Sequence, residues 1–316
     1  MCNRPLSTRG FSVAQYSRHG ADEGQEGCPP RLQADYVGLR RISWGVAPLD
    51  HFRGDRKVII VREVRGYSDE GSRAVKGIIL AGGLGTRLNP LTEITNKHLL
   101  PVGREPMIWH PVRQLVGARI TDIMVITSTH HMGSIVNSLG SGRRFGCEFT
   151  YRVQEEAGGI AHALLLARGF AADESSVVLL GDNIFEHSIA PFVDAFRVQE
   201  RGARVLLKEV GDPERFGVAA LDEKLIIEIE EKPKAPKSNH AVVGCYAYDS
   251  RVFDIIDGIE PSARGELEIT AVNNRYIARG ELQYSFVAGR WTDAGTFESL
   301  QQANELLLSN KNAILA

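Results

Sequence analysis

The sequence predicts an α/β fold with a mixed, mainly parallel sheet flanked by helices. From Lys76 onward, short β-branched apolar runs alternate with longer amphipathic stretches, as they do where helices join the strands of one sheet. The runs are apolar on both faces, which is typical of strands covered by helices on both sides of the sheet. With 43% hydrophobic and 24% charged residues among 316, the composition is that of a folded protein.

The expected elements follow from these patterns in chain order. Four runs rich in Ile, Val and Leu predict buried strands at 77–80, 123–127, 176–180 and 203–207. The stretches between them predict helices at 106–118, which follows a proline start, and at 131–140, 160–170 and 188–201. Apolar or small residues at helical spacing predict a packed terminal helix over 297–308.

The chain divides near position 75. Residues 1–74 carry 12 basic and 9 acidic side chains, whereas residues 75–316 carry 25 and 30. The first part shows neither a helical nor a strand period over most of its length, apart from a strand-like run at 57–62. We expect residues 1–74 to form a disordered or loosely packed N-terminal extension and residues 75–316 to form the folded domain.

Charge and cysteine content exclude several classes of protein. The net charge of −2 gives no global positive field that would draw the chain onto nucleic acid or an anionic membrane. The sequence has no apolar run of 18 or more residues, the length that a spanning helix needs. Its four cysteines are scattered and form no C-x-x-C pair, so we expect neither a disulfide framework nor a zinc site, and a cytoplasmic location.

A glycine-rich turn directly follows the first predicted strand. Gly82, Gly83 and Gly85 allow close backbone approach and positive φ, so successive N–H groups can form an anion-binding concavity. The spacing matches neither a dinucleotide fingerprint nor a Walker A loop. A simple tight turn is the alternative interpretation. The nearby Arg87 and Lys97 favour a triphosphate site, although a solvated Lys97 also fits the pattern.

Seven sequence blocks resemble the glucose-1-phosphate thymidylyltransferase family of sugar nucleotidyltransferases. They are Leu-Ala-Gly-Gly-Leu-Gly-Thr-Arg-Leu at 80–88, Asn-Lys-His-Leu-Leu-Pro-Val at 96–102, Leu-Gly-Asp-Asn-Ile-Phe at 180–185, Asp-Pro-Glu-Arg-Phe-Gly-Val at 212–218, Glu-Glu-Lys-Pro at 230–233, Pro-Ser-Ala-Arg-Gly-Glu-Leu-Glu-Ile-Thr at 261–270 and Trp-Thr-Asp-Ala-Gly-Thr at 291–296. They occur in the family's order and span about residues 75–307. The resemblance implies a Rossmann-like nucleotidyltransferase fold over 75–316. It also implies the conversion of dTTP and α-D-glucose 1-phosphate into dTDP-glucose and pyrophosphate, assisted by Mg²⁺.

The same resemblance implies roles for individual positions. Those expected at the nucleotide are Leu80, Gly82, Gly83, Gly85, Thr86, Arg87, Gln154, Gly159 and Asp182, with Gln154 and Gly159 at the thymine. Those expected at the sugar phosphate are Asn183, Gly217, Glu231, Lys232, Val243 and Gly244, with Glu231 on the hydroxyls and Lys232 on the phosphate. Asp182 and Asp293 are the expected metal ligands. Arg87, Lys97 and Lys232 are the expected catalytic cations.

Several alternatives stay open at this point. The enzyme could use another nucleoside triphosphate or another sugar 1-phosphate, since that choice depends on a few pocket contacts. The fold could also serve a non-catalytic regulatory subunit. Asp182 and Asn183 would suit a helix N-cap as well as a site. A homo-oligomer is one option for assembly.

The resemblance bears on the start of the chain as well. Family members commonly begin Met-Lys-Gly-Ile-Ile-Leu-Ala-Gly-Gly, and Val75 stands in the place of that methionine. Because a GTG start codon reads internally as valine, we expect translation to begin at residue 75, with the segment before it being a mis-assigned start.

Overall fold

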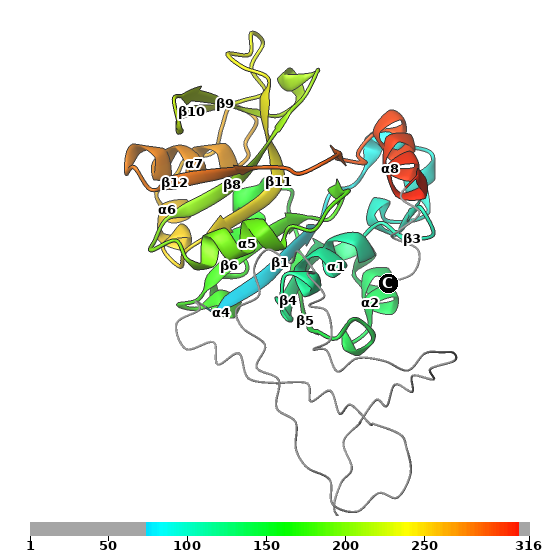
Figure 1. Ribbon diagram of the computed structural model, residues 1–316. Helices are drawn as coiled ribbons and strands as arrows, with labels where there is room; N and C mark the ends of the chain where they lie inside the picture. The colour runs from blue at the N-terminus through cyan, green and yellow to red at the C-terminus, as the bar shows by residue number, and fades with distance from the viewer. Residues whose placement is uncertain (1–73, 310–316) are drawn as a thin grey trace, which may run out of the picture. The chain divides into compact units, whose positions relative to one another are not determined.

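The computed structural model describes residues 74–309 (Figure 1). The expectations for residues 1–73, namely the strand at 57–62, the disorder and the alternative start, lie outside the described residues.

Parallel strands form the centre of the main sheet. Strand β1 (Val75–Ala81) lies between β4 (Asp122–Ser128) and β6 (Ser175–Leu180), and β5 (Glu148–Gln154) follows β4 at the edge. All of these pairings are parallel. The carboxyl ends of the central strands therefore meet at one edge of the sheet, where open α/β sheets bind their ligands.

The other half of the sheet is organised around the long strand β11 (His240–Tyr248). It runs antiparallel to β6, to β8 (Ala203–Glu209) and to β9 (Gly217–Asp222). Strand β10 (Leu225–Glu231) pairs antiparallel with β9, and β12 (Leu282–Phe286) pairs parallel with β8. The predicted mixed α/β sheet is thus confirmed, with its parallel part around β1 and an antiparallel part joined through β11.

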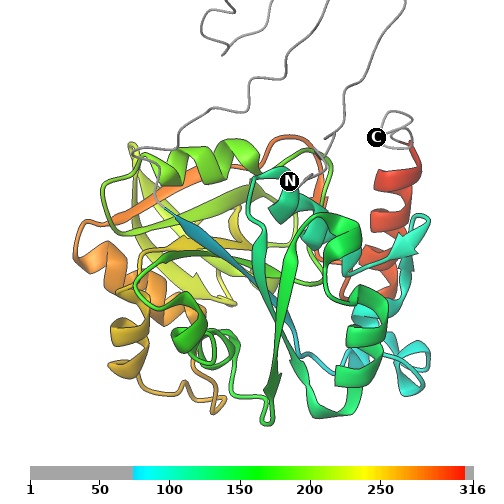
Figure 2. The same cartoon turned by 90° about the horizontal axis from the view of Figure 1, so that it is seen from below.

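Helices cover both faces of the sheet (Figure 2). Helices α1 (Trp109–Gly117), α2 (Met132–Leu139) and α5 (Ala190–Arg197) pack on one face with Ile79 of β1. Helices α3 (Ile160–Leu165), α4 (Arg168–Ala171), α6 (Val252–Asp257) and α7 (Ile269–Ala278) pack on the other face with Ile78. Successive β1 side chains thus enter opposite layers, which explains why the run from Ile78 to Ala81 is apolar at every position.

A third, smaller core lies beside the sheet. Helix α8 (Phe297–Ser309) packs near β2 (Pro101–Val102) and β3 (Glu105–Pro106), the red and cyan elements at the right of Figure 1. Its buried Ala303 and Leu306 share a cluster with Leu88, which follows the glycine-rich turn. The terminal helix therefore supports the loop region that leads away from β1.

The predicted strands and helices are largely confirmed. All four predicted runs are strands, and the predicted helices at 106–118, 131–140 and 188–201 correspond to α1, α2 and α5 with shorter bounds. The predicted helix at 160–170 is two short helices, α3 and α4. Strands β5, β9, β10 and β12 are among those that were not predicted. Within residues 74–309, no helix is long and apolar enough to cross a membrane.

Candidate functional site

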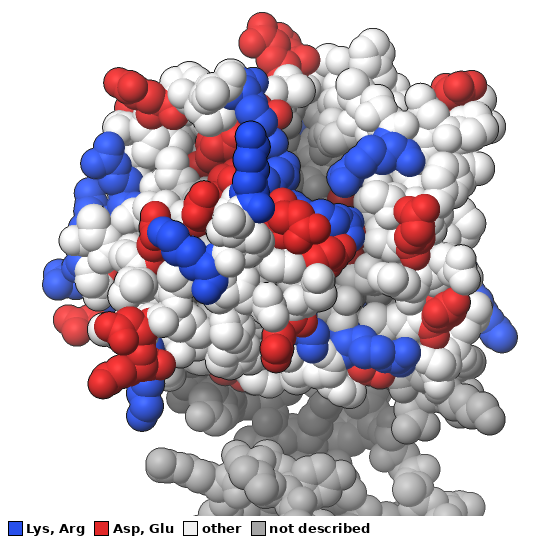
Figure 3. All heavy atoms as spheres, turned by 90° about the horizontal axis from the view of Figure 1, so that it is seen from above, with Lys and Arg blue, Asp and Glu red and all other residues white. Residues whose placement is uncertain are grey.

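A cavity of about 290 Å³ opens at the carboxyl edge of the central strands. Figure 3 looks down on the molecule from above and shows acidic and basic side chains gathered around a hollow in this face. The lining residues come from distant parts of the chain, among them Arg87, Asp182, Arg215, Glu231 and Asp293. The site therefore exists only in the folded protein.

The glycine-rich turn follows β1 at this edge. Gly85 has a φ of 69°, in the left-handed region that favours glycine, and a Cβ there would lie 2.9 Å from the Lys97 Cβ. A Cβ at Gly83 would lie 3.6 Å from Lys97 Nζ. Thr92 fixes the turn by donating its hydroxyl to the Gly85 carbonyl at 2.9 Å. The glycine-rich turn and the Lys97 side chain thus lie in close contact, as the sequence predicts.

Lys97 and Asp182 form an ion pair beneath the turn. The Nζ to Oδ2 distance is 2.5 Å, and the two side chains are only 11% and 14% exposed. Burial opposes the charged form of Asp182, but Lys97 outweighs it through its charge and hydrogen bond and holds the pKa of Asp182 below its usual range. Asp182 therefore stays ionised at neutral pH beside a buried ammonium group.

Asn96 and His98 hold the short 3₁₀ turn Lys97–Leu99 that carries Lys97. The Asn96 Oδ1 accepts from the His98 backbone N–H at 2.8 Å and lies 2.7 Å from His98 Nδ1, so this ring nitrogen carries the proton. Burial, aided by the charge of Lys97, lowers the pKa of His98 to about 3. The His98 imidazole is therefore neutral and held in one orientation beside the buried Lys97.

Asn183 is a buried junction between three segments of the site. Its Oδ1 accepts from the Gly244 backbone N–H at 2.9 Å and from Trp291 Nε1 at 2.8 Å. Its Nδ2 donates to Asp182 Oδ1 at 3.0 Å. A Cβ at Gly244 would lie 2.6 Å from Asn183 Nδ2, so glycine gives the room for this approach. Asn183 therefore orients Asp182 and is not a helix cap.

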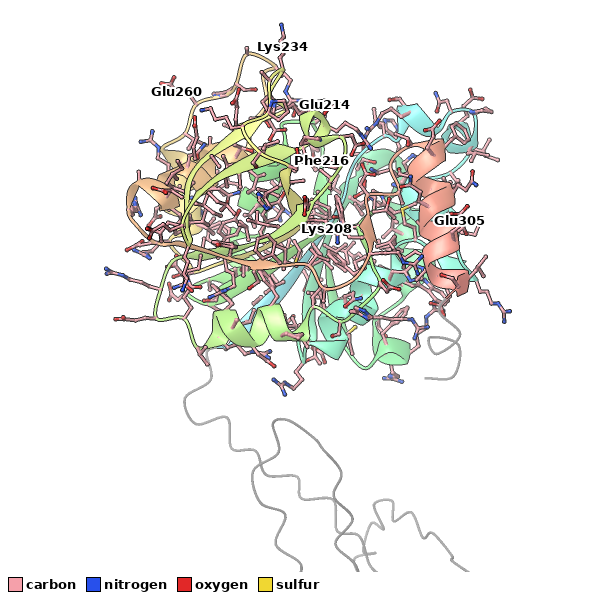
Figure 4. All side chains as sticks on the ribbon, turned by 45° about the horizontal axis from the view of Figure 1, so that its top comes forward. Lys208, Glu214, Phe216, Lys234, Glu260 and Glu305 are labelled. Carbon is pink, nitrogen blue, oxygen red and sulfur yellow. The ribbon has the colours of Figure 1, made fainter. Side chains whose placement is uncertain are left out.

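Asp293 follows strand β13 (Trp291–Thr292), which pairs with β7 (Ile184–Phe185). Its Oδ2 accepts from Arg215 Nη2 at 3.1 Å. Arg215 precedes Phe216, whose ring packs edge-on against Trp291 with centroids 5.5 Å apart. Figure 4 shows Phe216 at the upper end of the sheet, on the segment that leads into β9. Arg215 thus joins this segment to the carboxylate of Asp293.

Glu231 and Lys232 lie at the end of β10 on the opposite wall. The Glu231 Oε2 accepts from the Thr270 hydroxyl at 2.6 Å, and Arg264 approaches Oε1 at 3.4 Å. Lys232 has a φ of 47°, which is unusual for a residue with a side chain, and its N–H donates to the Phe216 carbonyl at 2.9 Å. Backbone strain at such a position is typical of functional sites.

Gln154 ends β5 and lies over the glycine-rich turn. A Cβ at Gly82 would lie 2.9 Å from Gln154 Oε1. The Gln154 Nε2 donates to the Gly159 carbonyl at 3.5 Å and lies 3.2 Å from His162 Nδ1. The structure therefore brings Gly82, Gln154 and Gly159 together. Leu80, the penultimate residue of β1, accepts from the Gly181 N–H with its carbonyl at 2.9 Å.

Most of the sequence-predicted residues surround one site. The predicted residues that line the cavity itself are Arg87, Asp182, Asn183, Gly217, Glu231, Lys232, Gly244 and Asp293. Thr86 and Arg87 are exposed beside the turn, in the 3₁₀ segment Thr86–Leu88. The expectation for Val243 needs correction as far as its side chain is concerned. Strand alternation buries that side chain in the opposite layer, while its neighbours Val242 and Gly244 line the cavity.

Sequence reasoning assigned no role to several cavity residues, among them Arg215, Tyr246, Thr270, Asn273 and Trp291. Three of them, Arg215, Thr270 and Trp291, lie within the blocks that carry the family resemblance, and this position was the available signal. Tyr246 and Asn273 had no such signal.

The donor set at Asp182 and Asp293 fits a divalent cation that takes its other ligands from phosphate and water. Both carboxylates line the same cavity, and Mg²⁺ needs only one or two of them when a phosphate is bound. Within residues 74–309, no group of three or more His, Cys, Asp or Glu residues is arranged to hold a metal alone. The site therefore suits a metal that enters with its nucleotide.

The nucleotidyl transferase family matches residues 76–310. A glucose-1-phosphate thymidylyltransferase from Xanthomonas campestris pv. campestris is 43% identical over 233 residues, which are 72% of this chain and 79% of the relative. The Neisseria meningitidis enzyme of the same name is 42% identical over 243 residues, or 75% of this chain and 84% of the relative.

Solved structures agree. A candidate glucose-1-phosphate thymidylyltransferase from Bacillus anthracis, crystallised with a sucrose, is 60% identical, with a TM-score of 0.72 over 74% of this chain and 95% of that one. A UDP-glucose pyrophosphorylase complexed with UDP-glucose is 25% identical, with a TM-score of 0.66 over 74% and 98%. The chain therefore belongs to the nucleotidyl transferase family and groups with its glucose-1-phosphate thymidylyltransferases.

Proposed function

We propose that this protein transfers the thymidylyl group of dTTP to α-D-glucose 1-phosphate, which gives dTDP-glucose and pyrophosphate. One observation carries the proposal. The glycine-rich turn with Lys97 on one side and Glu231 with Lys232 on the other converge on Asp182 and its neighbour Asn183. A nucleotide bound at the turn and a sugar phosphate bound near Glu231 would place their phosphates at this junction.

The chemistry needs two anions to meet. A phosphate oxygen of the sugar phosphate attacks the α-phosphorus of dTTP, the bond to the bridging oxygen breaks, and pyrophosphate leaves. Catalysis then consists mostly of positioning and charge neutralisation. Arg87 can approach from the exposed side of the turn, since Gly295 leaves space beside its guanidinium group, where a Cβ would lie 3.2 Å from Nη2. Lys232 supplies positive charge from the cavity wall, and Lys97 supplies it through its ion pair with Asp182.

Asp182 and Asp293 are the residues that would hold Mg²⁺. The metal would neutralise phosphate charge and help to align the nucleotide when it is bound. In the structure each carboxylate accepts from a cationic side chain, Asp182 from Lys97 and Asp293 from Arg215. These cations keep both carboxylates oriented toward the cavity, and they are themselves placed to contact phosphate oxygens.

Gln154 is the proposed reader of the base. Recognition of a pyrimidine edge needs an amide and a backbone group, and Gln154 lies beside Gly82 and the Gly159 carbonyl. Its position at the end of β5, beside the glycine-rich turn, supports a role on the nucleotide side of the site.

The second candidate function is nucleotidyl transfer from another nucleoside triphosphate or to another sugar 1-phosphate. The similarity to a UDP-glucose pyrophosphorylase favours this candidate. The test is a pyrophosphate-release panel of dTTP, UTP, CTP and GTP against several sugar 1-phosphates. We expect dTTP with glucose 1-phosphate among the best pairs. Activity only with another pair would replace this proposal by the second candidate, and no release with any pair would favour a non-catalytic binding protein. The cytoplasmic location and a homo-oligomeric state stay predictions.

A further inference from the structure

Asn273 is a cavity residue with an unused hydrogen-bonding atom. It lies on α7, is 1% exposed, and forms part of the cavity wall. Its Oδ1 accepts from the Tyr248 hydroxyl at 2.7 Å, whereas its Nδ2 has no hydrogen-bond partner within residues 74–309. Buried side-chain amides in folded proteins are nearly always paired, so an unpaired one at a cavity points to a missing ligand group.

The surroundings hold the Asn273 amide in place. The ring of Tyr248 stacks between those of Tyr246 and Tyr276, with centroids 6.1 and 5.8 Å away. The Tyr276 hydroxyl donates to Asp249 at 2.9 Å, which fixes the far end of this stack. Burial raises the pKa of the Tyr248 phenol, so that its O–H stays available to Asn273. The amide therefore cannot turn away to find a partner elsewhere without breaking this bond.

Helix geometry places Asn273 beside the sugar side of the site. Thr270 lies one turn earlier on the same face of α7, and its hydroxyl is already bonded to Glu231. Both residues line the cavity together with Gly217 and Tyr246. Asn274, the next residue, differs because its amide is fully used. It donates to the Ile229 carbonyl at 2.7 Å and accepts from the Ile229 N–H at 3.0 Å.

The chemistry of this wall favours a neutral ligand group. An amide nitrogen donates hydrogen bonds, and the neighbouring cavity residues Tyr246, Thr270 and Gly217 carry no positive charge that would hold a phosphate. A sugar hydroxyl fits both conditions, because it can accept from the amide and still donate its own proton to an acceptor.

We infer that Asn273 is a specificity-determining residue that donates its side-chain amide to one hydroxyl of the bound sugar. The inference rests on the proposed function, since it assumes that the sugar phosphate occupies the Glu231 side of the cavity. A site built to bond a hydroxyl rejects the analogue that lacks it, because the buried polar group is then left unpaired.

The test compares Asn273→Leu with Asn274→Ala in the full chain. Leucine has a similar size but no amide. Asn274→Ala removes an amide from the same helix, but the polar atoms of that amide bond the Ile229 backbone. For each protein, kcat/KM is measured with glucose 1-phosphate and with its 2-, 3-, 4- and 6-deoxy analogues, and the Kd values of dTDP-glucose and dTDP are measured by calorimetry. Thermal unfolding checks that each variant is folded.

We expect Asn273→Leu to lose about fivefold or more of the wild-type discrimination against one deoxy analogue, with less than twofold change for the others. It should weaken dTDP-glucose binding about fivefold or more and leave dTDP binding within twofold. Asn274→Ala should keep the wild-type discrimination pattern even where it lowers stability.

Two results overturn the inference in different ways. In the first, the wild type is active, but Asn273→Leu either keeps the wild-type discrimination among the deoxy analogues or loses it equally for all of them. Asn273 then only supports the fold. A wild type that does not use dTTP with glucose 1-phosphate refutes the proposed function, and with it this inference.

Discussion

Replacing Lys97 by methionine tests the buried ion pair at the centre of the site. Methionine keeps the length of the side chain but leaves the Asp182 carboxylate buried without its counter-charge. The two side chains are 11% and 14% exposed, so the loss should fall between that of an exposed pair and that of a fully buried one. We expect Lys97→Met to lower the free energy of unfolding by about 2 to 4 kcal/mol.

Lys237 offers a control with matched geometry. Its Nζ also lies 2.5 Å from a carboxylate oxygen, that of Glu228, but these side chains are 56% and 48% exposed. Lys237→Met should therefore cost less than about 1 kcal/mol. Urea unfolding of both variants gives the free energy that each ion pair contributes, for two pairs with the same N–O distance but different burial.

The double variant Lys97→Met with Asp182→Asn separates stability from catalysis. Because it removes both charges, it should recover part of the stability that either single change loses, with a coupling of about 1 to 3 kcal/mol. Turnover should not recover, since Asp182→Asn alone should lower kcat by about 10² or more at saturating Mg²⁺. Strictly additive stability losses would refute the ion-pair reasoning, and near-normal turnover of Asp182→Asn would refute the metal role.

Three further predictions concern other parts of the structure. Gln154→Ala should raise KM for dTTP more than KM for glucose 1-phosphate in steady-state assays, and equal effects on the two would contradict its assignment to the base. Gly85→Ala should destabilise the protein by about 1 to 2 kcal/mol in urea unfolding, because φ is 69° and the new Cβ would clash. Gly117→Ala at the end of α1, with nothing within 4 Å, should be neutral or stabilising, and similar effects at both glycines would argue against strain. Burial lowers the pKa values of His110 and His98, so the unfolded chain takes up these protons first and stability should fall as the pH drops below about 6.5. His110→Gln can still donate to the Val102 carbonyl and should flatten this decline, whereas an unchanged pH slope would exclude His110 as its source.

The parallel core was predictable because its signal is local. From Ile78 to Ala81 every β1 side chain is buried whichever layer it enters, and the sequence shows this as an unbroken apolar run. Strand β10 mixes exposed glutamates, among them Glu228 and Glu230, with apolar residues, and this mixture gives no strong local strand pattern. Strand β9 pairs with β11, and β10 pairs with β9, so tertiary pairing defines both strands.

The site divides in the same way. The glycine-rich turn and Lys97 follow one another in the chain, and their contact could be anticipated. The bond between Arg215 and Asp293 joins residues 78 positions apart, so only the fold reveals it. Asn273 is an extreme case, since its significance lies in an unpaired atom that no sequence pattern records.

Strand β11 connects two parts of the sheet that both contribute residues to the cavity. It pairs with β9 up to Val242 and with β6 from Cys245, so the sheet forks at Gly244, whose N–H bonds Asn183 instead of a strand. Gly217 of β9 and Leu180 of β6 both line the cavity. A ligand that contacts both strands would connect two parts of the sheet that pair with β11 on either side of Gly244. Hydrogen exchange of the β9 amides should then slow when a sugar nucleotide is bound, which makes the rigidity of this sheet a property of the complex rather than of the chain alone.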